Sequence, residues 1–154
     1  MANSLDGKLA LVTGAARRIG AAIATALHAA GANVAIHYRG SADEARALAD
    51  TLNNQREDSA TTVQADLLQT ATLPALVDDV IAWGGRLDIL VNNASTFYPT
   101  PMGKISEDDW NDLVGTNLKA PLFLSQAACD ELRKRRGNIV NIVDIHAQRP
   151  LRNH

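Results

Sequence analysis

Short apolar runs alternate along the chain with longer segments in which apolar residues recur at helical spacing. The first run, Leu9–Val12, is typical of a strand buried on both faces because it is apolar throughout, and Thr13-Gly14 ends it. Four more runs of this kind follow, each bounded by turn residues or by a change of spacing. The predicted strands are residues 9–12, 33–38, 61–64, 87–91 and 138–143.

Helices are predicted between these strands from apolar residues that recur every three or four positions. Ser41 and Ser106 stand three residues before Glu44 and Asp109, which is the spacing of a capping box at a helix start. The last helix continues past Pro121 and ends at Gly137. The predicted helices are residues 19–30, 42–52, 73–83 and 106–136.

The alternation of strand and helix predicts an α/β fold with a doubly wound parallel sheet, right-handed crossovers and helices on both faces. A chain of 154 residues is long enough for one such domain, so residues 1–154 are expected to form a single unit. Ligands of this class bind beyond the carboxyl ends of the strands. The residues that follow each strand are therefore the candidate site.

Charge and cysteine content narrow the possible partners and compartments. The formal charge of −2 gives no reason to expect nucleic acid or an anionic membrane as a partner. Cys129 is the one cysteine, which excludes an intrachain disulfide and a cysteine metal cluster and fits a reducing compartment. The first residues lack the pattern of a signal peptide, and no apolar run is long enough to span a membrane. A cytoplasmic protein is expected.

Neither the histidines nor the tryptophans predict a metal or cofactor site. His28 and His37 have no partner at ligand spacing, so we interpret both as structural and expect no metal site. Trp83 and Trp110 fall at helical core spacing and are expected to be packing residues.

A glycine turn joins the first predicted strand to the first predicted helix. Gly14 and Gly20 flank it, and Arg17 and Arg18 lie between them. The unpaired N–H groups of a helix N-terminus favour a phosphate, to which either arginine could add cationic donors. The glycine count is low for a dinucleotide fingerprint, since Arg18 stands where a middle glycine is usual. A tight connection with two solvated arginines is the alternative interpretation.

The second predicted strand ends in Tyr38, Arg39, Gly40 and Ser41 rather than in an acidic residue. An acid there would bind the ribose 2′-hydroxyl of NADH, whereas Arg39 can pair with the 2′-phosphate of NADPH. Ser41 can add a hydroxyl and a helix N-terminal amide, and Tyr38 can flank the adenine. The sequence therefore predicts NADPH as the cofactor, with a surface position of Arg39 beside a turn as the alternative.

Several motifs, in this order, resemble the landmarks of the short-chain dehydrogenase/reductase family and cover the chain from about Lys8 onward. They are TGAARRIG at 13–20, Asp66-Leu67, NNAS at 92–95, Asn117, and NIVNIV before Asp144. The resemblance implies a Rossmann-like fold in which Asp66 and Leu67 contact adenine and residues 92–94 lie along the cofactor. It also implies that Asn117 holds a water of the proton relay.

Departures from the usual family pattern point to one branch. Arg18 replaces a glycine, Ser95 replaces the last glycine of NNAG, and Asp144 stands at the position of the usual catalytic serine. Together with HYR before Ser41, the loop NASTFYPTP and the stretch VDIHAQRPL resemble the pteridine reductase branch, which includes dihydrofolate and dihydromonapterin reductases. By that resemblance Phe97 stacks on a pterin ring, Arg18 and Ser95 contact cofactor phosphate and substrate, and Asp144 assists protonation.

The same residues also have simpler interpretations. Phe97 could anchor a long loop by burial, and Asp144 could cap a turn. As an enzyme, the chain could instead be a 3-oxoacyl carrier-protein reductase or another ketoreductase, and outside catalysis a nucleotide-binding module.

The sequence predicts catalytic, substrate-binding and cofactor-binding residues. The candidate catalytic residues are Asp144 and Asn117, and the candidate substrate-binding residues are Arg18, Ser95, Phe97 and Asp144. The candidate cofactor-binding residues follow the strand ends. They are Gly14, Arg17, Arg18, Ile19, Gly20, Tyr38, Arg39, Gly40, Ser41, Asp66, Leu67, Asn93, Ala94 and Ser95.

The catalytic tyrosine and lysine of the family have no counterpart in the sequence. Tyr38 and Tyr98 lack a lysine four residues after them, and the resemblance places the pair a few positions beyond His154. We therefore expect residues 1–154 to be the amino-terminal part of a longer reductase, truncated after the fifth strand and inactive alone. Relatives are usually tetramers built on long helices, so residues 106–136 are a candidate interface of a homo-oligomer.

Overall fold

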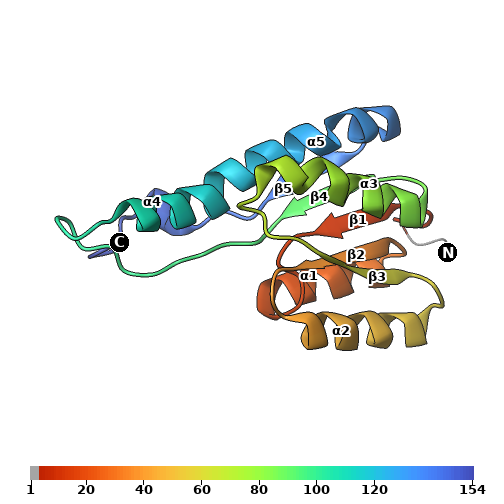
Figure 1. Cartoon of the computed structure of the whole chain (residues 1–154). Helices are drawn as coiled ribbons and strands as arrows, with labels where there is room; N and C mark the ends of the chain where they lie inside the picture. Colours follow the sequence, from red (N-terminus) through yellow and green to blue (C-terminus); the bar gives the residue numbers. More distant parts are fainter. Residues whose placement is uncertain (1–3) are drawn as a thin grey trace.

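The computed structural model describes residues 4–154 and confirms the predicted α/β fold (Figure 1). Within these residues, five parallel strands form one sheet in the order β3-β2-β1-β4-β5, as in a Rossmann-like fold. The order places the carboxyl ends of β1, β2 and β4 side by side. The strands are β1 (Leu9–Val12), β2 (Asn33–Tyr38), β3 (Ala60–Gln64), β4 (Ile89–Asn92) and β5 (Asn138–Asn141).

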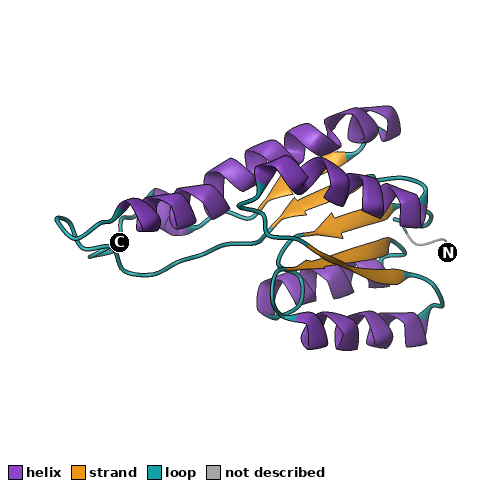
Figure 2. Ribbon diagram, in the orientation of Figure 1, coloured by secondary structure: helices purple, strands orange, loops and turns teal. Residues whose placement is uncertain are grey.

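Helices cover both faces of the sheet, as Figure 2 shows. On one face lie α1 (Arg18–Ala29) and α2 (Ala42–Gln55), and on the other α3 (Leu73–Gly84) and α5 (Ala120–Arg135). Short 3-10 turns occupy Thr70–Thr72 and Ile145–Ala147. The helix α4 (Glu107–Val114), the loop after β4 and the C-terminal residues project beyond the carboxyl ends of the strands (Figure 1).

Two apolar clusters hold the helices to the sheet. Leu11 and Val12 are neighbours in β1, and both are fully buried, but they belong to different clusters because successive side chains of a strand point to opposite faces. The central strand is therefore buried on both sides, as its apolar sequence predicts. Members of the clusters include Leu76, Val80, Leu90 and Leu124 on one face, and Ala24, Val34, Ile36 and Leu52 on the other.

One of the two predicted capping boxes is present. Asp109 N–H donates to Ser106 Oγ at 3.1 Å and Ser106 N–H donates to Asp109 Oδ2 at 2.9 Å, which closes the box at the start of α4. Ser41 begins α2 without a side-chain hydrogen bond. The second prediction is wrong because the Glu44 carboxylate pairs with Arg17 instead.

The predicted helix over residues 106–136 consists of three segments. A π-helical segment, Gly115–Lys119, separates α4 from α5. No residue of α4 is buried, and Trp110 is 62% exposed, so the prediction that Trp110 is a packing residue is wrong. Trp83 is also exposed, at the end of α3. Among the described residues, no helix is long and apolar enough to cross a membrane.

The last strand is shorter than the predicted range of 138–143. β5 pairs with β4 alone, and each of its four residues is exposed. After Asn141, Ile142 N–H still donates to Asn92 O of β4 at 2.9 Å, and the chain then leaves the sheet.

A buried carboxylate joins the amino ends of the central strands. Asp88, before β4, is 2% exposed and accepts hydrogen bonds from Leu9 N–H at 3.0 Å, from Lys8 Nζ at 3.2 Å and from Arg86 Nε at 2.6 Å. Burial alone would raise the pKa of Asp88, but the bonds from Arg86, Leu9 and Lys8 outweigh it and hold the pKa below its usual value. Asp88 is therefore a charged structural residue.

Candidate functional site

The turn after β1 directs the N-terminus of α1 toward the carboxyl edge of the sheet. Gly14 has a φ of +60°, which lies in the left-handed region that glycine adopts without strain. Gly20 packs so closely that a Cβ there would lie 2.6 Å from Asn93 Nδ2 and 2.8 Å from Ala15 Cα. No side chain of the described residues caps α1, so its first N–H groups remain available to an anion.

The two arginines of this turn differ in conformation and in partners. Arg18 has a φ of +54°, which costs a residue with a Cβ about 1 kcal/mol or more. The backbone thus keeps the left-handed conformation that a glycine would adopt freely. Arg17 pairs with Glu44 of α2 at 3.3 Å between Nη1 and Oε1, and this pair is partly exposed.

His37 fixes the glycine turn to the ends of two neighbouring strands. Its Nδ1 accepts from Gly14 N–H at 3.1 Å, and its Nε2 lies 3.1 Å from Ala65 O. A carbonyl oxygen only accepts, so Nε2 carries the proton and the ring is neutral. Burial lowers the pKa of His37 to about 4, against the smaller opposing effects of the Ala65 carbonyl and Asp66. The structure agrees with the structural role expected of His37.

The low pKa of His37 predicts a loss of stability in acid. The unfolded chain binds a proton near pH 6.5 and the folded chain near pH 4, so the contribution is complete above pH 6.5 and is lost as pH falls through about 4. A difference of this size corresponds to about 3 kcal/mol. Urea unfolding at pH 7 and pH 4 should show this excess loss in the wild type relative to His37→Gln, whose amide does not titrate. Equal losses in both proteins would contradict it.

Thr13 and Asn93 join the turn to the end of β4. Thr13 Oγ1 accepts from the N–H groups of Asn93 at 2.9 Å and Ala94 at 3.0 Å, and it donates to Val91 O at 3.2 Å. Asn93 Nδ2 donates to the carbonyl oxygens of Thr13 at 2.9 Å and Gly14 at 3.3 Å. The Asn93 side-chain amide therefore holds the turn in position. Asn93 also lines the cavity at the carboxyl ends of the strands.

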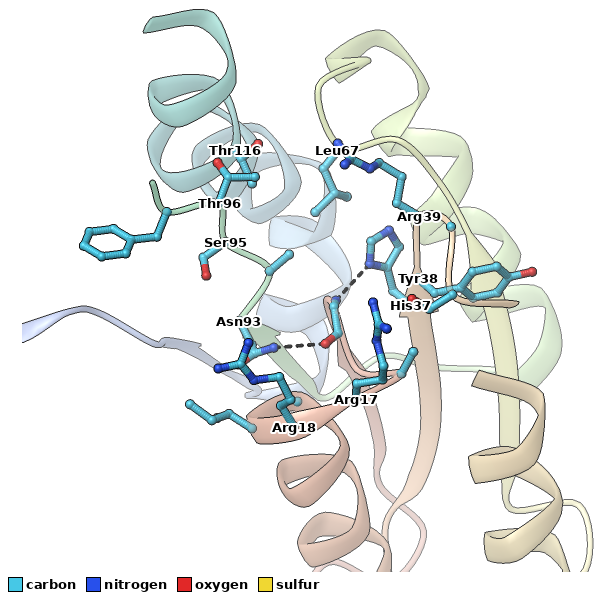
Figure 3. A pocket seen from close by; sticks show the side chains of 18 of the residues that line it. Arg17, Arg18, His37, Tyr38, Arg39, Leu67, Asn93, Ser95, Thr96 and Thr116 are labelled. Carbon is cyan, nitrogen blue, oxygen red and sulfur yellow. Dashed lines mark hydrogen bonds between the residues drawn. The ribbon is translucent and has the colours of Figure 1, made fainter. Parts of the chain in front are cut away.

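These elements surround a cavity of about 1080 Å³ at the carboxyl ends of the strands (Figure 3). Ser95 and Thr96 lie at one side of the view, and Arg39 and Tyr38 lie at the other. Asn92, which was expected along the cofactor, does not line this cavity, whereas every candidate catalytic, substrate-binding and cofactor-binding residue except Asn117 does. The residues are Gly14, Arg17, Arg18, Ile19, Gly20, Tyr38, Arg39, Gly40, Ser41, Asp66, Leu67, Asn93, Ala94, Ser95, Phe97 and Asp144.

Asn117 lies outside the cavity lining, and its neighbour Thr116 takes part instead. Both ends of the Asn117 amide bind the main chain of Thr96, with Thr96 N–H donating to Oδ1 at 3.1 Å and Nδ2 donating to Thr96 O at 2.8 Å. Asn117 thus holds the loop after β4 against the π-helical segment. Its role in a proton relay stays a prediction.

Phe97 and Asp144 meet the C-terminal residues at the far side of the cavity. Phe97 is 56% exposed, so it does not anchor its loop by burial. Its ring stacks on His154, with centroids 4.6 Å apart, and on His146 at 6.2 Å. The Asp144 carboxylate accepts from His146 N–H at 2.8 Å and caps the short turn, which confirms the capping interpretation. Asp144 also lines the cavity, and its role in protonation stays a prediction.

Comparison with known proteins decides the family. The sequence model of the short chain dehydrogenases matches residues 8–153. The chain belongs to the short-chain dehydrogenase family. It is 42% identical over an alignment of 189 positions to pteridine reductase 1 of Leishmania tarentolae, covering 98% of this chain and 65% of that protein. It is 37% identical over 139 residues to a 3-oxoacyl carrier-protein reductase of Staphylococcus aureus, covering 90% of this chain and 56% of the relative.

Membership of the short-chain dehydrogenase family implies a nicotinamide dinucleotide cofactor, and the cavity fits one. The uncapped N-terminus of α1 leaves N–H donors for a phosphate. Gly14 and Gly20 allow the turn to pack tightly, because a Cβ at Gly14 would meet Ala94 and a Cβ at Gly20 would meet the Gly14 carbonyl oxygen. The volume is that of a site for a large ligand. Among the described residues, no group of His, Cys, Asp and Glu could hold a metal ion.

Some residues that line the cavity were not predicted as site residues. They are Ala16, His37, Leu68, Thr96, Thr116 and Glu44, which pairs with Arg17. The sequence position of Glu44 could have indicated a place in the site, because Glu44 lies in the first turn of the helix that follows Arg39. We interpreted that position as part of a helix cap instead. The position of His37 in the cavity wall depends on pairing of β2 with β1, which periodicity alone does not show.

Proposed function

We propose that this protein is an NADPH-dependent short-chain reductase that transfers a hydride to a dihydropterin or dihydrofolate. The observation that carries the proposal is that Arg39, Ser41, Phe97 and Asp144 all line one cavity. The 42% identity to a pteridine reductase supports the substrate class.

On the cofactor side, the proposed roles follow from charge and helix geometry. Arg39 and Ser41 bind the 2′-phosphate, because a guanidinium forms strong hydrogen bonds with phosphate and a helix N-terminus adds amide donors. The open N-terminus of α1 binds the pyrophosphate. NADPH supplies the hydride.

On the substrate side, Phe97 offers a flat apolar wall on which a pterin ring can stack. A parallel ring is already tolerated there, since His154 lies 4.6 Å from Phe97 at an angle of 17°. Hydride addition to a C=N carbon requires a proton at the nitrogen, and Asp144 assists this transfer from the cavity wall. Arg18 and Ser95 orient the ring between the cofactor and Asp144.

A second candidate, reduction of a 3-oxoacyl thioester, is favoured by the 37% identity to the Staphylococcus aureus relative. The deciding experiment follows NADPH oxidation by the full-length protein, which would carry the tyrosine and lysine of the family, with dihydrobiopterin, dihydromonapterin, dihydrofolate and an acetoacetyl thioester. Turnover of a pteridine is the expected result. Turnover of the thioester alone would replace the proposal with the second candidate, and turnover of none would favour a non-catalytic nucleotide-binding module.

Arg39→Ala is expected to weaken NADPH binding by about 10- to 100-fold, because a charge-assisted bond to phosphate contributes about 1.5–3 kcal/mol. NADH binding should change little, since NADH lacks the 2′-phosphate. Calorimetric titration with both nucleotides checks the prediction. Arg46→Ala is the matched control, because Arg46 is also an arginine of the α2 region but pairs with exposed Asp43 away from the cavity. Equal losses for NADPH and NADH would contradict the assignment of Arg39.

A further inference from the structure

The part of the cavity that we propose binds the adenosine 2′-phosphate also contains a carboxylate, which has no role in the proposed function. Glu44 lines the cavity together with Arg39, Gly40 and Ser41, and its Oε1 lies 3.3 Å from Arg17 Nη1. Of the three arginines in the described cavity wall, Arg17 alone has a carboxylate partner. The pair links the N-terminus of α1 to the first turn of α2.

The Glu44 side chain is 46% exposed, so water screens its charge without removing it. A 2′-phosphate bound by Arg39 and Ser41 would bring nearly two further negative charges close to this carboxylate, and like charges at such range repel. Binding would also require Arg17 to divide its donors between Glu44 and the phosphate. A ribose 2′-hydroxyl meets no such repulsion, because a hydroxyl can donate a hydrogen bond to a carboxylate.

We propose that Glu44 is a specificity-determining residue of the cofactor site that limits the preference for a 2′-phosphorylated adenosine and widens tolerance for the unphosphorylated form. The inference rests on the proposed NADPH site. It assigns to Glu44 the opposite effect from Arg39, on the same ligand group and in the same cavity.

The test is calorimetric titration of the protein with 2′,5′-ADP and with 5′-AMP, which differ by the phosphate in question. Glu44→Gln should strengthen 2′,5′-ADP binding by about 3- to 10-fold, the effect of one nearby charge partly screened by water. Binding of 5′-AMP should stay the same or weaken. The gain for 2′,5′-ADP should shrink as salt is raised, because the groups are accessible to ions.

Asp43→Asn is the matched control, because it removes the same charge from the same helix turn. The Asp43 side chain is 97% exposed and is not part of the cavity wall. Unchanged or weaker 2′,5′-ADP binding by Glu44→Gln would overturn the proposal, as would an equal gain with Asp43→Asn. The ratio between the two ligands does not depend on how much protein is folded. A wild type that fails to prefer 2′,5′-ADP would overturn the NADPH proposal instead, since the Glu44 effect is measured as a change from wild type.

Discussion

Gly20→Val is expected to abolish nicotinamide nucleotide binding and to lower the free energy of unfolding by about 4 kcal/mol or more. Any Cβ at this position would meet the Gly14 carbonyl oxygen, Asn93 Nδ2 at 2.6 Å and Ala15 Cα at 2.8 Å. Two of these three atoms belong to the backbone, so no side-chain rotation relieves the contact. The N-terminus of α1 would have to move away from the turn, and the anion site would be lost. Urea unfolding and calorimetry measure the two effects.

The smaller change Gly20→Ala keeps the test informative if the valine variant does not fold. It should retain secondary structure by circular dichroism while binding no nucleotide. Gly40→Ala is the control for stability, because a Cβ there would meet nothing within 4 Å. A Gly20→Ala protein with wild-type stability and nucleotide affinity would show that the turn is not packed as described.

Asp88→Ala is expected to cost about 4 kcal/mol of stability, within the range for loss of one member of a buried charge cluster. The substitution leaves Leu9 N–H without its acceptor and removes the carboxylate that neutralises Arg86 and Lys8. Since the pKa of Asp88 is lowered in the folded chain, its contribution is present above the usual aspartate pKa and is lost as pH falls through the lowered value. Urea unfolding at neutral pH measures the loss.

Two further variants serve as comparisons for the stability loss of Asp88→Ala. Asp88→Asn keeps an acceptor for Leu9 N–H and should cost about half as much, because a neutral bond remains. Asp43→Asn breaks an exposed pair with Arg46 and should cost less than about 1 kcal/mol. If Asp88→Ala and Asp43→Asn cost the same, Asp88 would not have the structural role assigned to it.

The fold could be predicted from the sequence because the residues that indicate each helix or strand lie within that element. Leu9–Val12 is apolar throughout, and the structure buries it on both faces. Ser106 and Asp109 cap a helix with atoms three residues apart, so the signal lies within one turn. The candidate site residues could be predicted from the order of strands and helices along the chain, because the residue after a parallel strand lies at the carboxyl edge of the sheet.

Contacts between distant residues could not be predicted in this way. The bond from Gly14 to His37 spans two elements, and the bonds of Asp88 reach Leu9 and Lys8 across the sheet. Ser41 and Glu44 have the local spacing of a capping box, but Arg17 lies close enough in space to bind the carboxylate first. Spacing in the sequence indicates which neighbouring partners a side chain could bind, and the tertiary structure determines which partner it does bind.

The π-helical segment between α4 and α5 has a further consequence for the long helix. It widens one turn by a residue, which corresponds to about 100° of rotation about the axis. In an uninterrupted helix Trp110 and Leu124 would be nearly four turns apart and would face the same way, yet Leu124 is fully buried and Trp110 is not. A helical wheel drawn through the whole stretch is therefore offset by about 100° between the residues before Gly115 and those after Lys119. The face that α5 turns to the sheet, with Leu124 buried, does not continue along the same side of α4, which buries no residue.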